Sequence, residues 1–212
     1  MNHKQKFLQK ARLYLILDTQ VNSYSELLKV ARQALRGGVD VVQLRDKNGS
    51  PKDVIHFSKH LHNIINRKIP FIMNDRIDLA LLCKTDGVHL GQEDVPVGYA
   101  RKLLGKKPLI GLSCQKRSHM KNIELNNVDY LGLGSVFKTK TKPGRKPMAL
   151  SFLKKILPQT PLPVFAIGGI TLGSISVLKN CGVRRVAVCR EIALSKNVFM
   201  TTRKFKNELT AP

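Results

Sequence analysis

The sequence has no tryptophan, and aromatic residues make up only 6% of its 212 residues. It contains no run of 18 apolar residues, so we expect neither a transmembrane helix nor a membrane partner. The first twelve residues are charged and lack the apolar stretch and cleavage site of a secretory signal. Together these absences predict a cytoplasmic protein.

Acidic residues are also scarce, with 14 Asp and Glu against 37 Lys and Arg, for a formal net charge of +23. Such an excess attracts anions, and three classes of partner fit it: nucleic acids, anionic membranes and phosphorylated small molecules. The basic residues are spread along the chain, and no zinc finger or RNP-type aromatic motif accompanies them. We therefore expect no specific nucleic-acid partner, and non-specific polyanion binding stays open.

Two common kinds of motif are missing as well. The four cysteines (Cys83, Cys114, Cys181 and Cys189) are too widely spaced for a zinc or redox motif, so we interpret them as buried or incidental thiols. No G-x-x-x-x-G-K-[ST] loop exists, which argues against an ATP-binding P-loop. The first predicted strand runs into Asp18-Thr19-Gln20, without the glycines of a dinucleotide-binding turn.

Short apolar segments alternate with longer amphipathic ones along the whole chain. Strands are predicted at 13–17, 39–44, 70–73, 87–90, 109–112, 128–131, 164–167 and 185–189. The clearest helices are predicted at 24–35, 51–65 and 172–179, and Ser23 with Glu26 has the spacing of a capping box before the first. Eight strands alternating with helices imply a parallel sheet, either open and doubly wound or closed. Without a glycine-rich first turn we favour an α/β protein with a single (β/α)8 TIM barrel domain over 1–212.

In such a barrel the chemistry lies at the carboxyl ends of the strands. Seven consecutive predicted strands deliver polar or glycine residues there, although any one of them alone would be typical of an ordinary loop. They are Gln43, Arg45 and Lys47 after the second strand, Asn74 and Asp75 after the third, Asp94 after the fourth, Ser113 at the fifth, Thr139, Lys140, Thr141 and Lys142 after the sixth, Gly168 and Gly169 after the seventh, and Cys189 and Arg190 after the eighth.

Two of these groups suggest specific ligands. Gly168 and Gly169 precede a predicted helix after the seventh strand, where backbone N–H groups commonly bind phosphate, although a plain turn would look the same. Asp75 and Asp94 stand at adjacent strand ends, and a shared Mg²⁺ would relieve their repulsion. The alternative is that each carboxylate pairs with a Lys or Arg, and an additional role of Asp75 as a helix N-cap stays open.

The histidines are weaker candidates. His56, His60 and His62 lie on the second predicted helix, which faces away from the rim, and we interpret them as solvated surface. His89 alternates with apolar neighbours on the fourth strand, so we expect it to hydrogen-bond inside the barrel.

Five segments in register carry a family resemblance from about Leu13 to Arg190. They are Gln43-Leu44-Arg45-Asp46-Lys47, Asn74-Asp75-Arg76-Ile77-Asp78, Asp86-Gly87-Val88-His89-Leu90-Gly91-Gln92-Glu93-Asp94, Thr139-Lys140-Thr141-Lys142 and Ala166-Ile167-Gly168-Gly169-Ile170. Together they resemble the thiamine-phosphate synthase family. The resemblance implies a (β/α)8 transferase that joins a hydroxymethylpyrimidine diphosphate to a thiazole phosphate, with or without a 2-carboxylate, and releases pyrophosphate with Mg²⁺.

The resemblance also implies roles for individual residues. Gln43, Arg45, Lys47, Asn74, Ser113 and Lys142 match the pyrimidine-diphosphate site, with Arg45, Lys47, Ser113 and Lys142 as the catalytic set. Asp75 and Asp94 match the Mg²⁺ ligands. Thr139, Thr141, Gly169, Cys189 and Arg190 match the thiazole-phosphate site, and Leu44, Asp46, Lys140 and Gly168 complete the substrate-binding set. The departure is Cys189-Arg190, where a small hydroxyl residue is expected; Arg190 either binds the phosphate or turns outward.

Two other functions stay in consideration. A thiazole tautomerase on the same barrel would need no diphosphate or metal positions, and a non-catalytic polyanion-binding barrel would explain the positive charge alone. For the synthase, we expect residues 132–147 to form a mobile active-site loop, because the segment is rich in Gly, Pro and basic residues. The expected partners are two phosphorylated small molecules, and assembly into a homo-oligomer stays open.

Overall fold

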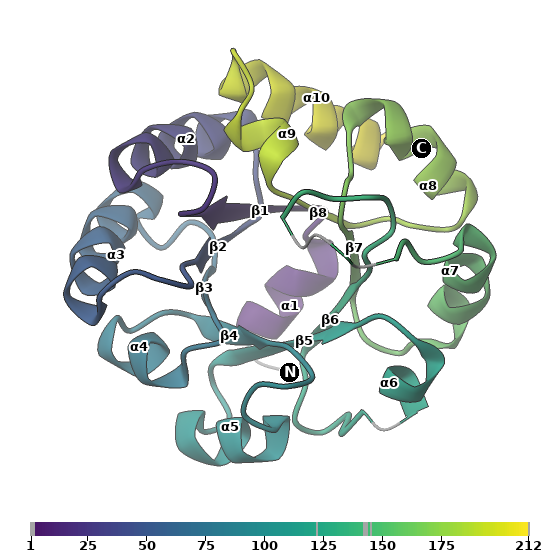
Figure 1. The fold of residues 1–212 in the computed structure, drawn as a ribbon, viewed down its shortest axis with the longest axis horizontal. Coiled ribbons are helices and arrows are strands. Elements are labelled where there is room, and N and C mark those ends of the chain that lie inside the picture. The colour runs from purple at the N-terminus through teal and green to yellow at the C-terminus, as the bar shows by residue number, and fades with distance from the viewer. Residues whose placement is uncertain (1–2, 122, 142–143, 145, 212) are drawn as a thin grey trace.

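Eight parallel strands form a closed barrel in which each strand pairs with its neighbours in chain order and β8 returns to β1 (Figure 1). The computed structural model describes residues 3–121, 123–141, 144 and 146–211. The strands are β1 Leu13–Asp18, β2 Val41–Arg45, β3 Phe71–Asn74, β4 Gly87–Leu90, β5 Leu109–Cys114, β6 Tyr130–Leu133, β7 Val164–Ile167 and β8 Val186–Val188. The predicted (β/α)8 barrel is therefore confirmed.

Most of the helices surround the barrel and connect successive strands, whereas the first lies across the amino end of the barrel and the last two follow the eighth strand (Figure 1). They are α1 His3–Lys10, α2 Tyr24–Gly37, α3 Pro51–Ile65, α4 Ile77–Leu82, α5 Val97–Leu104, α6 Arg117–Lys121, α7 Leu150–Ile156, α8 Ile175–Asn180, α9 Arg190–Ala193 and α10 Val198–Thr210, with short 3-10 helices η1 Leu157–Gln159 and η2 Leu172–Ser174. No helix in these described ranges is long and apolar enough to cross a membrane.

Most predicted boundaries agree with the structure within one or two residues, and the differences have local causes. The capping box of α2 is confirmed, since the Ser23 hydroxyl accepts from Glu26 N–H and the Glu26 carboxylate accepts from Ser23 N–H at 2.8 Å. The sixth strand begins at Tyr130, two residues later than the predicted 128–131. Val128 is buried in the core, as a strand residue would be, but it precedes the paired residues of β6. The helix predicted at 172–179 is divided into η2 and α8.

Side chains alternate between two apolar layers, and this alternation decides which residues can face the site. Leu15, Leu17 and Leu44 point outward and pack beneath the helices. Tyr14 and Ile16 point inward and belong to the cluster that fills the barrel. Successive residues of one strand therefore have different roles, with the inward ones forming the floor and walls of the site.

The N-terminal helix α1 closes the amino end of the barrel, an element that the sequence pattern did not predict. It crosses the centre of the ring in Figure 1, on the far side of the strands. Leu8 and Ala11 are buried in the inner cluster. Lys4 Nζ lies 2.7 Å from Asp86, and Gln5 donates to Asp129 at 2.6 Å. Within the described residues, α1 thus covers the amino end of the barrel, and the carboxyl end is open to a ligand.

Candidate active site

A cavity of about 280 Å³ opens at the carboxyl end of the barrel, where the strand ends deliver polar groups. Most of the sequence-predicted site residues line it: Gln43, Arg45, Asn74, Ser113, Thr139, Lys140, Thr141, Gly168, Gly169, Cys189 and Arg190. Residues that are more than a hundred positions apart in the chain are thus brought to one place by closure of the barrel.

Three described residues of the predicted substrate-binding set do not line the cavity: Leu44, Asp46 and Lys47. The Leu44 side chain is fully buried in the outer apolar layer, because it alternates with the inward-facing Gln43. Asp46 instead holds the turn before α3, accepting from the Tyr24 hydroxyl and, at 2.7 Å, from Gly49 N–H. Burial would raise the pKa of Asp46, but these hydrogen bonds lower it below its ordinary value. Lys142 lies outside the described residues.

Arg45 is the buried cation of the site, with 7% of its surface exposed. Its Nη1 donates to Asp18 at 2.8 Å and to the Gln20 side-chain carbonyl at 3.0 Å. Its Nε is buried and has no hydrogen-bond partner among the described residues. A buried donor without a partner is costly, and a ligand oxygen would satisfy it. Asp18, fully buried at the end of β1, supports Arg45. The sequence did not predict this role, because Arg45 lies 27 residues away on another strand.

Lys47, Asp75 and Asp94 form a second group, after the ends of β2, β3 and β4 and outside the lining of the cavity. Lys47 pairs with Asp75. Burial and a hydrogen bond with Asp75 raise the pKa of Asp94 above its ordinary value. The expectation that Asp75 caps a helix is wrong, since Arg76 occupies the N-cap of α4 and makes no capping bond.

The donor set of this group fits a hard divalent cation. Asp75 and Asp94 follow adjacent strands, and after burial the nearby Asp75 carboxylate is what raises the pKa of Asp94. Mg²⁺ is typically bound through one or two protein carboxylates together with phosphate oxygens of a substrate. No group of three or more His, Cys, Asp or Glu that could hold a metal occurs within the described part of the chain. The fit therefore requires ligand oxygens as well as these two carboxylates.

Gly168 and Gly169 follow β7, with φ of +100° and +64°. A Cβ at Gly168 would lie 2.1 Å from Ser135 Oγ, and one at Gly169 would lie 2.4 Å from the Lys138 carbonyl oxygen. Glycine is required here both by the left-handed backbone and by the close approach of the segment after β6. The Phe137 N–H donates to the Gly168 carbonyl at 3.0 Å, so the two segments are hydrogen-bonded beside the cavity.

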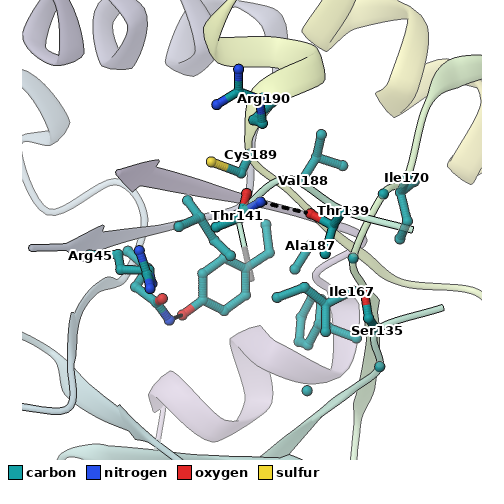
Figure 2. A pocket seen from close by; sticks show the side chains of 18 of the residues that line it. Arg45, Ser135, Thr139, Thr141, Ile167, Ile170, Ala187, Val188, Cys189 and Arg190 are labelled. Atoms are coloured by element: carbon teal, nitrogen blue, oxygen red, sulfur yellow. Dashed lines mark hydrogen bonds between the residues drawn. The ribbon is translucent and has the colours of Figure 1, made fainter. Parts of the chain in front are cut away.

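The segment after β6 supplies Thr139 and Thr141, which lie together in Figure 2 and are joined by a hydrogen bond from Thr141 N–H to Thr139 Oγ1 at 3.2 Å. Across from them, burial raises the pKa of the Cys189 thiol to about 12. In the view of Figure 2 the Arg190 guanidinium is directed away from the two threonines. At the position where the sequence departs from the expected pattern, Arg190 thus lines the cavity but does not point toward Thr139 and Thr141.

A row of polar side chains, all buried except the half-buried Ser113, crosses the floor of the cavity. The members are Gln43, Tyr14, Tyr130, His89 and Ser113. His89 hydrogen-bonds inside the barrel as predicted. Tyr14 and Tyr130 were missed, because an aromatic residue within an apolar strand is ordinarily a core residue and only the closed barrel brings the two hydroxyls together.

The closed barrel has a carboxyl-end cavity with a buried arginine and a glycine turn, and beside the cavity stands a lysine paired with one of two carboxylates. Together these features define a (β/α)8 protein with a site suited to anionic ligands. Comparison with known proteins narrows this class. A family profile described as thiamine monophosphate synthase matches residues 13–192. The chain belongs to this family.

Individual relatives agree. A thiamine-phosphate synthase from Fusobacterium nucleatum is 37% identical over 191 residues, covering 90% of this chain and 93% of that protein. One from Prochlorococcus marinus is 40% identical over 201 residues, covering 94% of this chain, which spans only 57% of that protein. Among solved structures, thiamine phosphate pyrophosphorylase from Pyrococcus furiosus has a TM-score of 0.85 at 30% identity, covering 95% of this chain and 96% of that one.

Proposed function

We propose that this protein is a thiamine-phosphate synthase. It condenses 4-amino-2-methyl-5-(diphosphooxymethyl)pyrimidine with 4-methyl-5-(2-phosphooxyethyl)thiazole, or its 2-carboxy form, and releases pyrophosphate. Family membership supports the proposal, and the observation that carries it is a rim with two separate anion-binding regions, one around Arg45 and Lys47 and one at Gly168 and Gly169. Two phosphorylated substrates need two such regions.

The pyrimidine diphosphate is assigned to the side of β2 to β5. Arg45 would donate its unpartnered Nε to a phosphate oxygen, and Lys47 would add a second cation. Asn74 and Ser113 line the adjacent wall. Asp75 and Asp94 would hold Mg²⁺, which when bound supplies positive charge beside the diphosphate.

The reaction needs no nucleophilic side chain and no general base. The C–O bond between the pyrimidine methylene and the diphosphate breaks, and its electron pair leaves with pyrophosphate. The aminopyrimidine stabilises the resulting cation, and the lone pair of the thiazole nitrogen forms the new C–N bond. The protein's residues neutralise the leaving charge and orient the two rings, which is the work that preorganised cations and amides do well.

The thiazole phosphate is assigned to the opposite side, at Thr139, Thr141, Gly168 and Gly169. Gly132 and Leu133, at the start of the segment expected to be mobile, belong to β6, and Phe137 is hydrogen-bonded beside β7. We assign the lid to the part of 132–147 that follows Phe137, with Lys142 closing over the diphosphate. Closure would exclude water, which could otherwise capture the cation. The enzyme would act in the cytoplasm on free small molecules.

The test is an assay with both substrates and Mg²⁺, in which thiamine phosphate and pyrophosphate are measured together. Equal amounts of the two products are expected. An Arg45→Gln variant should lose most of the activity, and an Arg76→Gln variant, altered at a half-exposed surface arginine, should keep it. Conversion of the thiazole phosphate alone, with no need for the pyrimidine, would instead identify a thiazole tautomerase. A folded protein that makes neither product would refute the proposal.

A further inference from the structure

Five side chains from five strands form one continuous hydrogen-bonded row beneath the cavity. Gln43 Nε2 donates to the Tyr14 hydroxyl at 2.8 Å, and the Tyr14 and Tyr130 hydroxyls lie 3.0 Å apart. The Tyr130 hydroxyl lies 3.2 Å from His89 Nδ1, and His89 Nε2 lies 2.9 Å from Ser113 Oγ. All five residues belong to the lining of the cavity, and Gln43 and Ser113 stand at the two ends of the row.

The row is deeply buried, and its hydroxyls stay protonated. Tyr14 and Tyr130 are 2% and 1% exposed, and both pack against the Phe165 ring. Burial raises the pKa of both tyrosines well above the ordinary value. Each hydroxyl therefore has one proton to donate and accepts through its oxygen. In surroundings of low polarity, the hydrogen bonds of such a row are strong when every donor and acceptor in it has a partner.

The shape of the barrel interior is adapted to the row. Gly111 on β5 stands beside Tyr130 and His89, and a Cβ there would lie 2.2 Å from Tyr130 Cζ and 2.4 Å from His89 Nδ1. Gly132 on β6 faces the other edge of the imidazole, with its hypothetical Cβ 3.1 Å from His89 Cε1. Two strands thus omit side chains where the ring and the phenol need room.

The amide at one end sets the direction of every hydrogen bond in the row. A side-chain NH2 can only donate, so Tyr14 accepts from Gln43, and its own proton is satisfied within the row only when it is directed to Tyr130. Tyr130 then turns its proton to His89 Nδ1, which makes His89 the Nε2–H tautomer. That N–H donates to Ser113 Oγ, so the serine proton is directed to the cavity.

The two ends of the row consequently present opposite polarity to a ligand. Gln43 Oε1 accepts no hydrogen bond from the described residues and is left as an acceptor, while Ser113 is left as a donor. A 4-aminopyrimidine carries amine N–H donors and ring-nitrogen acceptors, which match this pair. A 4-oxopyrimidine carries a carbonyl acceptor and a ring N–H in the corresponding positions, which oppose it.

We propose that the Tyr14, Tyr130 and His89 row is a specificity device that selects an aminopyrimidine over an oxopyrimidine by fixing the donor and acceptor ends of the site. Tyr14, Tyr130 and His89 act as positioning residues through Gln43 and Ser113. This inference rests on the proposed function for the identity of the ligand, whereas the His89 tautomer is inferred from the hydrogen bonds of the row and does not depend on the ligand.

The test compares the parent protein with Tyr130→Phe, which removes the central hydroxyl and keeps the ring. Tyr14→Phe provides a second break in the row, and Tyr99→Phe, at an exposed tyrosine on α5, is the matched control. Nitrogen-15 NMR of the histidine rings, with the His89 signal assigned from a His89→Gln variant, reports the tautomer. Calorimetry with the hydroxymethyl forms of the amino- and oxopyrimidine reports the ratio of their Kd values.

The parent should show the Nε2–H tautomer and a Kd ratio that favours the aminopyrimidine. Tyr130→Phe should reduce that ratio by about tenfold, the size expected for one directed hydrogen bond, and Tyr99→Phe should leave it unchanged. An Nδ1–H tautomer in the parent, or an unchanged ratio in both row variants, would overturn the inference. A parent that makes no thiamine phosphate would refute the proposed function, while the tautomer and the Kd ratio would still decide the role of the row.

Discussion

Replacing Asp18 by asparagine should expose how much the site depends on one buried ion pair. Asp18 is fully buried, and its carboxylate accepts from Arg45 Nη1 at 2.8 Å and from Gln20 N–H at 2.9 Å. Asparagine keeps the shape and one acceptor but removes the negative charge. Arg45, with 7% of its surface exposed, would then carry an uncompensated charge inside the protein.

The magnitude follows from the burial of both partners. Breaking a buried pair by removing one charge costs about 3–5 kcal/mol of the free energy of unfolding. The matched control is Asp78→Asn, which breaks the ion pair between Asp78 and Arg76. The Arg76 side chain is 46% exposed and the Asp78 side chain is 56% exposed. An exposed pair of this kind contributes roughly 0–1 kcal/mol. The two substitutions make the same chemical change, so the difference between them measures the effect of burial.

Urea unfolding at pH 7, followed by circular dichroism, provides the measurement, with the midpoint and the slope fitted together for parent and variants. Asp18→Asn should lower the midpoint at an unchanged slope, and the KM for the pyrimidine diphosphate should rise because Arg45 is no longer oriented. If Asp18→Asn costs less than about 1 kcal/mol, no more than the control, Arg45 is not held by this pair and the reasoning fails.

The remaining predictions concern the metal, the lid and the thiol. Asp75→Asn and Asp94→Asn should each lower turnover by at least about tenfold, with partial rescue by raised Mg²⁺; parental activity of both in the presence of a chelator would exclude the metal assignment. Lys142→Ala should raise the share of hydrolysed pyrimidine at saturating thiazole phosphate, and substrates should protect 132–147 from protease in the parent; equal cleavage with an unchanged product ratio would contradict a lid. With a pKa of about 12, Cys189 should be a thiolate in only about one molecule in 10⁴ at pH 8, so mass spectrometry should detect slow alkylation in the folded protein and rapid alkylation in urea. Rapid labelling of folded protein at Cys189 would show that burial does not protect the thiol.

Local features of the chain were readable from the sequence because they depend on nearest neighbours. Eight apolar segments alternating with amphipathic ones predict a parallel sheet, because parallel strands are joined by long crossovers that are usually helices. The missing glycine-rich first turn then favours a closed barrel. The capping box at Ser23 depends on residues three apart. The strand-end positions of Gln43 and Ser113 follow from the same pattern, because every strand of a parallel barrel ends at one rim.

Only the tertiary structure decided which of these residues meet, and what they do to one another. Tyr14 and Tyr130 are 116 residues apart in sequence, and their hydroxyls touch because the barrel closes. The helix α1 has no pattern that marks it as a plug, and its place depends on the hole that eight strands leave at the amino end. Asp75 pairs with Lys47 across two strands, where the sequence suggested a helix cap as readily. Sequence periodicity carries the direction of a side chain within its own strand, but its partners depend on the closure of the barrel and the register between strands, which are properties of the whole chain.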